Sequence, residues 1–372
     1  MRNKRVLIIA SHPASLLNFR RQLILDIAEK KWEVHLASPN IDNYADALAT
    51  LGVDIHQLPL QRTGTNPLFD LFSFFRICWL ITKIKPKKLI TYTIKPVIYG
   101  SLAARFLRVE NCYPLITGLG YAFNSDIVQN KLTRIINFLY RQSLKSVTII
   151  FFQNPDDERL FRKKGLVGHD VSTCVVNGSG VDTKHYALVT PPTTITFLLI
   201  ARLLISKGVQ EYIKAAKVIK TKYPHMKFKI VGDIDKGNPD SINPSEIDKW
   251  IDEGLVEWKG YLNDVRPAIA DSAIYVLPSY REGTPRSVLE AMSMGKPIIT
   301  TDVPGCRETV INGYNGFLVS AKSVDELVSA MQRFIENPSL VLQMGLRSRE
   351  IVEQKYDVHD VNELMLKSMG ID

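Results

Sequence analysis

The clearest chemical signal in this sequence is a polar segment that follows a short apolar run in its second half. Ile274–Leu277 has the composition of a buried strand, and Glu282, Gly283, Pro285 and Glu290 follow it. Pro285 favours the first turn of a helix, so Glu282 is predicted in the strand-to-helix loop and Glu290 about one and a half turns into the helix. The free backbone N–H groups of such a turn favour an anion or a hydroxylated ligand.

Each of these residues also has an ordinary structural interpretation. Glu282 alone could be a solvated loop residue, and Glu290 could pair with Arg286 four positions earlier on one helix face. The complete segment at the end of a strand favours the functional interpretation.

Two cations follow the first strand predicted in the same half. Arg202 and Lys207 come directly after Thr196–Ala201, which places both in the loop at the carboxyl end of that strand. A guanidinium fork and an ammonium group can hold a diphosphate and stabilise the negative charge that develops on it as a leaving group. No Asp/Asn cluster nearby suggests a Mg²⁺ site, so we predict that no metal takes part. The alternative is a pair of surface cations at a helix start.

These loops belong to a chain that alternates short β-branched runs with longer amphipathic stretches, which is typical of βα units around a parallel sheet. The strands expected in the first half are Arg5–Ala10, Glu33–Ala37, Asp54–Leu58, Lys88–Tyr92, Tyr113–Ile116, Val147–Phe152 and Thr173–Val176. Those expected in the second half are Thr196–Ala201, Lys227–Val231, Val256–Lys259, Ile274–Leu277, Pro297–Thr300 and Gly316–Val319. We therefore predict an α/β fold with two doubly wound sheets, whose ligands bind at the carboxyl ends of the strands.

A polar, Pro-rich stretch over 190–194 lacks periodicity and marks a domain boundary. We predict domains at 1–185 and 193–355, and a terminal helix within 356–372 that packs back on the first domain. The length of 372 residues agrees, because it exceeds what one hydrophobic core usually supports.

The positive charge is concentrated in the first half of the chain. Lys plus Arg number 47 and Asp plus Glu 38, which gives a net charge of +9. Residues 1–190 hold 25 basic and 14 acidic residues (+11), whereas residues 191–372 hold 22 and 24 (−2). Such a half predicts an anionic partner, which could be nucleic acid, a lipid surface or a phosphorylated substrate.

The four cysteines lie far apart, at Cys78, Cys112, Cys174 and Cys306. They form no CxxC or Cys/His cluster, which indicates neither a zinc site nor a disulfide framework and fits a reducing cytosol. The apolar run after the basic start is too short for a signal peptide. No run of about eighteen apolar residues is present, so no bilayer-spanning helix is expected.

Arg202 and Lys207, together with the paired glutamates of Glu282–Glu290, resemble the family 4 retaining glycosyltransferases. The resemblance extends over nearly the whole chain and includes the strip Asn177–Asp182. It implies the GT-B fold, in which two Rossmann-like domains face each other across a cleft. The N-terminal domain would face the acceptor and the membrane, and the C-terminal domain would bind the nucleotide sugar.

The same resemblance implies a nucleotide diphosphate sugar as donor, a UDP-sugar above all, with no cofactor and no metal. The two cations would bind the diphosphate, Glu282 would hold sugar hydroxyls, and Glu290 would accept hydrogen bonds from the ribose. The implied donor-binding residues are Arg202, Lys207, Glu282, Gly283, Thr284, Pro285 and Glu290, of which Glu282, Arg202 and Lys207 would have catalytic roles. Reaction would proceed with retention at the anomeric carbon.

One stretch departs from the family pattern. Many members carry a His near the sugar, but Ile116–Phe123 has none, so no catalytic His is assigned. Its Thr-Gly-Leu-Gly form resembles the branch that acts on polyprenyl diphosphate-linked sugars in bacterial O-antigen, capsule and glycan assembly. The acceptor-side residues predicted in the first domain are His12, Ser15, Arg62, Asn66, Gly118 and Gly120, each of which also fits an ordinary turn or loop.

Two basic amphipathic segments could contact lipid. Pro67–Lys88 repeats large apolar residues near helical spacing and ends in lysines, and Lys131–Lys145 interleaves cations with apolar residues. Basic amphipathic helices can lie in a lipid interface, where each cation near an anionic leaflet contributes about 1 kcal/mol. The alternative is a core-facing apolar stripe with a solvated basic face. We expect a cytoplasmic protein that lies peripherally on the anionic inner face of the cell membrane.

The expected function is transfer of a hexose or N-acetylhexosamine to an undecaprenyl-diphosphate-linked saccharide. A soluble or lipid A-core saccharide is the alternative acceptor. A nucleic-acid-binding protein is disfavoured, because no recognised nucleic-acid motif is present and the cations alternate with apolar residues. The complete set of donor-site residues also disfavours a non-catalytic sugar-nucleotide-binding protein.

Overall fold

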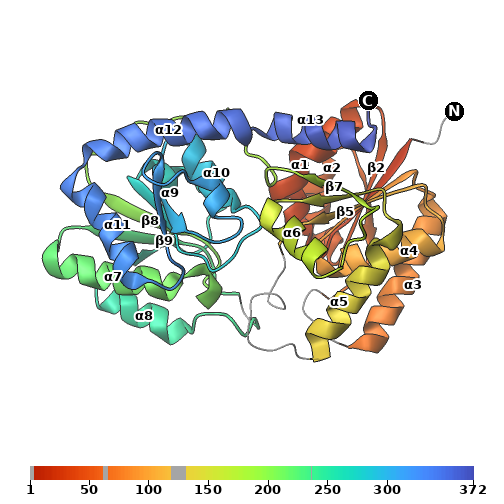
Figure 1. Ribbon diagram of the computed structural model, residues 1–372, viewed down its shortest axis with the longest axis horizontal. Coiled ribbons are helices and arrows are strands. Elements are labelled where there is room, and N and C mark those ends of the chain that lie inside the picture. The colour runs from red at the N-terminus through yellow and green to blue at the C-terminus, as the bar shows by residue number, and fades with distance from the viewer. Residues whose placement is uncertain (1–3, 62–65, 119–130, 236) are drawn as a thin grey trace. The chain divides into compact units, whose positions relative to one another are not determined.

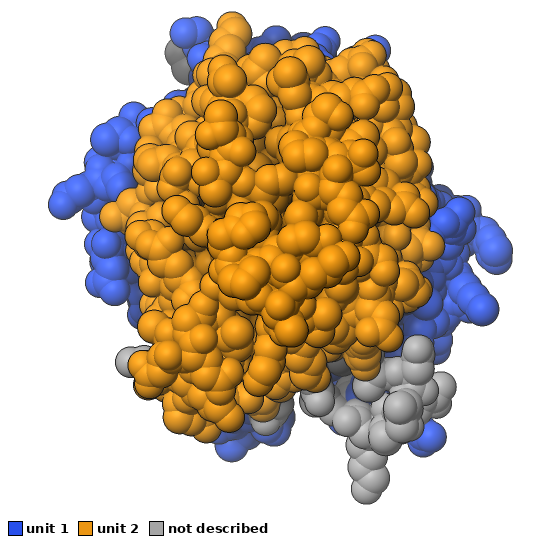
Figure 2. All heavy atoms as spheres, turned by 90° about the vertical axis from the view of Figure 1, so that its left-hand side faces the viewer, with its two compact units in different colours: residues 1–179, 359–372 blue, residues 180–358 orange. Residues whose placement is uncertain are grey.

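A computed structural model describes residues 4–61, 66–118, 131–235 and 237–372 of the chain (Figure 1). They form two compact units, which Figure 2 shows in different colours: residues 1–179 with 359–372, and residues 180–358. Each unit contains a single parallel sheet covered by helices, so the predicted α/β class with two doubly wound sheets is confirmed.

The sheet of the first unit has seven strands in the order β3-β2-β1-β4-β5-β6-β7. They are β1 (Arg5–Ile9), β2 (Glu33–Ser38), β3 (Asp54–Gln57), β4 (Lys88–Tyr92), β5 (Asn111–Ile116), β6 (Ile149–Phe152) and β7 (Ser172–Val175). Its helices are α1 (Pro13–Glu29), η1 (Ile41–Tyr44), α2 (Ala45–Ala49), α3 (Pro67–Ile84), η2 (Pro96–Gly100), α4 (Ser101–Phe106), α5 (Lys131–Ser143), η4 (Leu144–Ser146), α6 (Pro155–Lys163) and α13 (Val358–Met369).

Both faces of this sheet are buried, as its apolar strands predict. Successive residues of a strand point to opposite faces, and those of β1 enter two different cores. Val6 and Ile8 pack with residues of α1 and α13, whereas Leu7 and Ile9 pack with residues of α3 and α4.

The terminal helix α13 belongs to the first unit, although the second unit separates it from the rest of that unit in sequence. It lies beside α1, where the Asn362 amide donates to Asp26 Oδ2 at 2.6 Å (Figure 1). Its last residues reach the sheet, because the carbonyl of Met369 accepts from the Tyr113 hydroxyl at 3.1 Å.

The sheet of the second unit has six strands in the order β10-β9-β8-β11-β12-β13. They are β8 (Thr196–Ile200), β9 (Lys227–Val231), β10 (Glu257–Trp258), β11 (Ile274–Leu277), β12 (Ile298–Thr301) and β13 (Gly316–Val319). Its helices are η5 (Ile205–Lys207), α7 (Val209–Lys222), α8 (Pro244–Asp252), α9 (Arg266–Ala270), α10 (Arg286–Ser293), η6 (Arg307–Thr309), α11 (Val324–Glu336) and α12 (Ser339–Lys355). Strand β8 lies between β9 and β11, so loops from both neighbours reach the loop that follows it.

Candidate functional site

The loops after β8 and β11 are joined at the carboxyl edge of the second sheet. The amide of Tyr280 donates to the carbonyl of Ser206 at 2.9 Å. Gly208 has a φ of +71°, and a Cβ there would lie 2.1 Å from the carbonyl oxygen of Pro278. Only glycine allows this approach, which holds the two loops together.

Lys207 and Glu282 meet across these joined loops. The Lys207 Nζ forms an ion pair with Glu282 Oε1, although the residues are 75 positions apart in sequence. Only 21% of the Lys207 side chain and 12% of the Glu282 side chain are exposed. The Ser279 hydroxyl also donates to Glu282 Oε1, at 2.8 Å. The structure thus brings together one predicted cation and one predicted acid at the carboxyl edge of the sheet.

The backbone of Glu282 is held by the loop after β12. Its amide donates to the carbonyl of Pro304 at 3.0 Å. A Cβ at Gly305 would lie 2.3 Å from the carbonyl oxygen of Glu282. The loop after β12 can therefore come this close to Glu282 only because residue 305 is a glycine. The loops after three strands that are neighbours in the sheet, β8, β11 and β12, therefore fix the position of Glu282.

Glu290 lies on α10 and is almost fully buried, with 12% of its side chain exposed. It accepts from Arg286 Nε at 3.2 Å. Burial raises the pKa of Glu290, and Arg286 and Tyr186 oppose that rise. The i, i+4 pair with Arg286 that the sequence allowed is therefore present.

The start of α10 differs slightly from the prediction. Pro285 was expected in the first helical turn, but its ψ of 109° is extended and the helix begins at Arg286. The proline is therefore the residue before the helix, where its missing N–H is equally harmless. Gly283 and Thr284 precede it in the same loop, and the Thr284 hydroxyl donates to the carbonyl of Gly283 at 3.0 Å.

Arg202 turns the other way, toward the loop after β9. Its NH1 forms an ion pair with Asp235 Oδ2, which also accepts from the Asn238 amide at 3.0 Å. The Arg202 side chain is 46% exposed. Because β8 lies between β9 and β11, its loop sends Arg202 to one neighbour and Lys207 to the other. Both cations are thus paired with a carboxylate.

Two buried residues beneath this site were not predicted from the sequence. The Cys306 thiol is buried, which raises its pKa to about 12, and the nearby Glu282 charge adds to that rise. The Tyr275 hydroxyl contacts Ser287 Oγ at 2.6 Å, and burial raises its pKa, with further contributions from Glu290 and Glu282. No spacing rule links either residue to the site, because Tyr275 lies within β11 and Cys306 in the loop after β12.

The residues predicted on the acceptor side lie in the first unit. His12 is exposed and precedes α1, and Ser15 on that helix donates to the His12 carbonyl at 2.5 Å. Ser15 Oγ also lies 3.0 Å from the hydroxyl of Tyr92, whose pKa burial raises to about 12. The buried guanidinium of Arg20 lies 5.8 Å from the Tyr92 ring centre. Arg20 and Tyr92 thus extend a polar group that the sequence indicated only at His12 and Ser15.

The remaining predicted residues of this unit are not brought into that group by any described contact. Asn66 caps α3, where its side-chain oxygen accepts from the Leu68 amide at 3.0 Å. Gly118 has a φ of +136°, which favours glycine. Arg62 and Gly120 lie outside the described residues.

Comparisons with known proteins identify the family that this chain resembles. A family profile described as "Glycosyl transferases group 1" matches residues 181–351, and one described as "Glycosyl transferase 4-like" matches residues 5–154. The chain is 28% identical to an N,N'-diacetylbacillosaminyl-diphospho-undecaprenol alpha-1,3-N-acetylgalactosaminyltransferase of Campylobacter jejuni, over 98% of this chain and 97% of the relative.

A second relative and a solved structure extend the comparison. The chain is 26% identical to a UDP-Gal:alpha-D-GlcNAc-diphosphoundecaprenol alpha-1,3-galactosyltransferase of Escherichia coli, over 76% of this chain and 75% of the relative. The fold resembles that of Anabaena HepE, solved in complex with UDP and glucose, with a TM-score of 0.80, 18% identity and 99% of both chains covered.

Proposed function

Because this chain belongs to the glycosyl transferases that both profiles describe, we propose that it transfers a hexose or N-acetylhexosamine from a nucleotide diphosphate sugar to a saccharide carried on undecaprenyl diphosphate. The Lys207–Glu282 ion pair at the joined ends of β8 and β11 is the observation that carries the proposal. It supplies a cation for a departing phosphate and an acceptor for sugar hydroxyls in one place. The names of two relatives, both of which concern diphospho-undecaprenol, support the acceptor.

The proposed donor is a UDP-sugar bound by the second unit. The fold likeness to a protein solved with UDP supports this choice. Both Lys207 and Arg202 are already paired with carboxylates, Glu282 and Asp235. An arriving diphosphate therefore replaces the two carboxylates as the partner of Lys207 and Arg202. Between turnovers both cations are paired with the carboxylates again. The exchange releases Glu282 from Lys207 and frees its oxygens for the hydroxyls of the sugar.

In the proposed reaction the bond from the anomeric carbon to the β-phosphate oxygen breaks and the bond to the acceptor oxygen forms on the same face. The departing phosphate oxygen takes the proton of the acceptor hydroxyl. Lys207 and Arg202 stabilise the negative charge on the diphosphate as it leaves. Ser279 continues to hold Glu282 through its 2.8 Å hydrogen bond. Glu290 accepts from the ribose, and Arg286 opposes the rise in its pKa that burial causes.

A transfer assay tests the function directly. We expect the full chain, given a panel of UDP-sugars and a short-chain polyprenyl diphosphate N-acetylhexosamine, to yield one product that is a single sugar heavier, with the α configuration retained from the donor. We also expect equal turnover after treatment with a chelator. Binding of UDP without transfer from any donor to any acceptor would instead support a sugar-nucleotide-binding protein, and a saccharide without a lipid as better acceptor would support the alternative substrate.

The lipid carrier requires a site at the membrane, and we propose that α3 and α5 of the first unit supply it. Five large side chains of α3 follow helical spacing and are half or more exposed, from 50% at Trp79 to 77% at Leu68; they are Leu68, Leu71, Phe72, Phe75 and Trp79. Ile135 and Phe138 of α5 are exposed to 55% and 56%. Large exposed apolar groups of this kind are typical of interaction surfaces.

Cations accompany the apolar side chains of α3. The Arg76 guanidinium lies 4.6 Å and the Lys83 ammonium 5.2 Å from the centre of the Trp79 ring. The opposite face of α3, which includes Ile77 and Leu80, packs into the core. The alternative that the apolar stripe of this segment faces the core is therefore wrong for the five exposed side chains named above. Aromatic side chains beside cations favour an anionic lipid interface over a protein core. No helix in the described part of the chain is long and apolar enough to cross a bilayer.

Flotation with vesicles tests the membrane proposal. We expect the chain to float with vesicles that contain anionic lipid. The double variant Phe72→Glu and Phe75→Glu should bind them roughly tenfold or more weakly, because two rings that would enter the lipid are lost and two negative charges that an anionic surface repels are added. The matched control is Leu342→Glu on α12, a leucine exposed to 53% in the other unit. Equal flotation of the double variant and the wild type, or none of the wild type, contradicts the proposal.

A further inference from the structure

Four side chains with metal-binding groups lie on one face of the first sheet, at the pair of strands that includes its edge. Strands β2 and β3 are parallel, with His35 opposite Asp54 and Ala37 opposite His56. Glu33 and His35 are two apart on β2, and Asp54 and His56 are two apart on β3, so all four point to the same face. No sequence pattern indicated this group, because its two histidines are 21 positions apart and no cysteine accompanies them.

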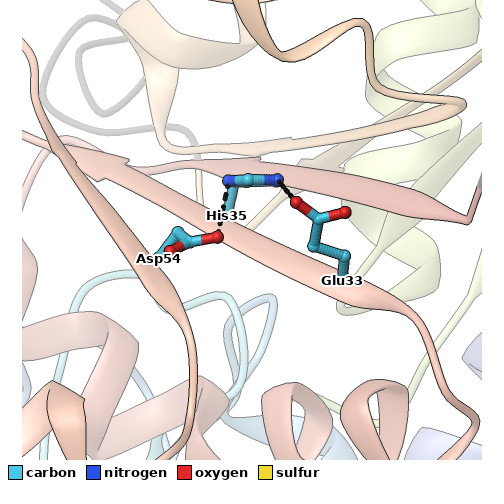
Figure 3. Close-up of side chains that lie close together, drawn as sticks. All are labelled: Glu33, His35 and Asp54. Carbon is cyan, nitrogen blue, oxygen red and sulfur yellow. Dashed lines mark hydrogen bonds and ion pairs between the residues drawn. The ribbon is translucent and has the colours of Figure 1, made fainter.

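The His35 ring is the centre of the group. Its Nδ1 lies 3.1 Å from His56 Nε2 and 3.4 Å from Asp54 Oδ2, and its Nε2 lies 3.0 Å from Glu33 Oε1. Figure 3 shows the two carboxylates at opposite ends of this ring. The His35 side chain is only 8% exposed, whereas Asp54 is 62% exposed, so the group opens to solvent on the Asp54 side.

The hydrogen bond to Glu33 determines which nitrogen of His35 carries a proton. A carboxylate can only accept, so the proton belongs on Nε2 and the lone pair of Nδ1 faces His56 and Asp54. Glu33 is itself held by Arg5, whose Nε donates to its second oxygen at 2.9 Å. A histidine that ligates a metal usually donates its other N–H to a carboxylate in this way, which fixes the ring and its tautomer.

We propose that His35 Nδ1, His56 Nε2 and Asp54 Oδ2 bind a divalent transition metal ion, Zn²⁺ in particular, and that Glu33 orients His35 for this role. Tetrahedral zinc bonds of about 2.0–2.2 Å place neighbouring ligand atoms about 3.3–3.5 Å apart. The separations of 3.1 and 3.4 Å around Nδ1 are close to these values. Within the described residues, potential ligand atoms of Glu33, His35 and Asp54 all lie within 4.8 Å of one another. His56 adjoins this group through its 3.1 Å contact with His35 Nδ1.

The chemistry of the group selects the metal. Two imidazole nitrogens with one carboxylate oxygen suit zinc, whereas Mg²⁺ and Ca²⁺ prefer oxygen ligands alone. Three protein ligands leave one position for water. Burial, His35 and Lys83 lower the pKa of His56, and Asp54 opposes them. The metal would take the place of the proton between the two rings and fasten the edge strand β3 to β2.

Cobalt serves as a spectroscopic probe of this site. We expect the full chain, stripped of metal with a chelator, to bind one equivalent of Co²⁺ with the visible absorption of a tetrahedral site, and Zn²⁺ to displace it and raise the unfolding temperature. His56→Gln and Asp54→Asn should each weaken binding by about tenfold or more, and Glu33→Gln by about ten- to a hundredfold. The matched control is His169→Gln, an exposed histidine elsewhere in the first unit.

Three results would overturn the inference. They are no Co²⁺ or Zn²⁺ binding by the wild type, equal binding by His56→Gln and Asp54→Asn, or an equal loss in His169→Gln. Circular dichroism of each variant shows whether it folds, and the two ligand substitutions are at partly exposed positions, so at least one should remain folded. UDP binding, which the second unit supplies in the proposed function, reports separately on that function.

Discussion

Replacement of Glu282 by glutamine is expected to lower kcat/KM for sugar transfer by roughly two to three orders of magnitude while the chain remains folded. The amide keeps the size of the side chain and its contact with the Ser279 hydroxyl, but it removes the charge that pairs with Lys207. It also presents an N–H group where sugar hydroxyls would donate, which leaves one hydroxyl without its acceptor. The measurement is steady-state transfer with saturating lipid acceptor, with circular dichroism as the test of folding.

The matched control for this variant is Glu257→Gln. Glu257 pairs with Lys259 at 2.5 Å in the same unit, and both side chains are about half exposed, at 52% and 48%. Exposed pairs contribute about 0–1 kcal/mol to stability, so neither activity nor folding should change. Turnover of Glu282→Gln within a few-fold of the wild type would show that this carboxylate does not serve the reaction and would remove its assigned role.

The sheets were predictable because their strands are local and strongly patterned. The expected strands Lys227–Val231, Ile274–Leu277 and Gly316–Val319 coincide with β9, β11 and β13. The expected Val256–Lys259 is shorter, since β10 covers only Glu257–Trp258 at the edge of the sheet, where it has one neighbour. Apolar content marks a buried strand well, but the ends of an edge strand depend on a partner that the local sequence does not specify.

The loops of the candidate site were predictable, but their internal pairings were not. Polar residues that follow parallel strands lie at one edge of the sheet, and for this reason Lys207 and Glu282 were predicted as site residues. Lys207 and Glu282 form a pair because β8 lies beside β11 in the sheet. Arg202 pairs with Asp235 because β9 lies on the other side of β8. The order of strands is a property of the whole domain, so a local pattern cannot give it.

Helix α3 shows the corresponding limit for surfaces. Its sequence is apolar on more than one side, and periodicity alone could not say which side enters the core. The structure buries Ile77 and Leu80 and leaves Phe75 and Trp79 exposed. The neighbouring strands and α4 decide which stripe is covered, and they lie outside the segment whose pattern is being interpreted.

Replacement of Lys207 by methionine is expected to weaken binding of UDP and of UDP-sugars by roughly ten- to a hundredfold, because a charge-assisted hydrogen bond to a phosphate contributes about 1.5–3 kcal/mol. Calorimetric titration of the full chain measures this change. The loss should diminish as salt concentration rises, since the attraction of the wild type is itself screened. Lys259→Met, which removes an exposed lysine at the edge of the same sheet, should bind as the wild type does.

The single variant alone has two explanations, because it also leaves the largely buried Glu282 without its cation. An uncompensated carboxylate in this position would repel a diphosphate even if Lys207 never touched it. The double variant Lys207→Met with Glu282→Gln separates them, since it removes both charges. If Lys207 binds the diphosphate, the double variant should bind UDP nearly as weakly as the single one. Recovery of wild-type affinity would instead assign the whole effect to Glu282, and unchanged affinity in the single variant would exclude Lys207 from the donor site.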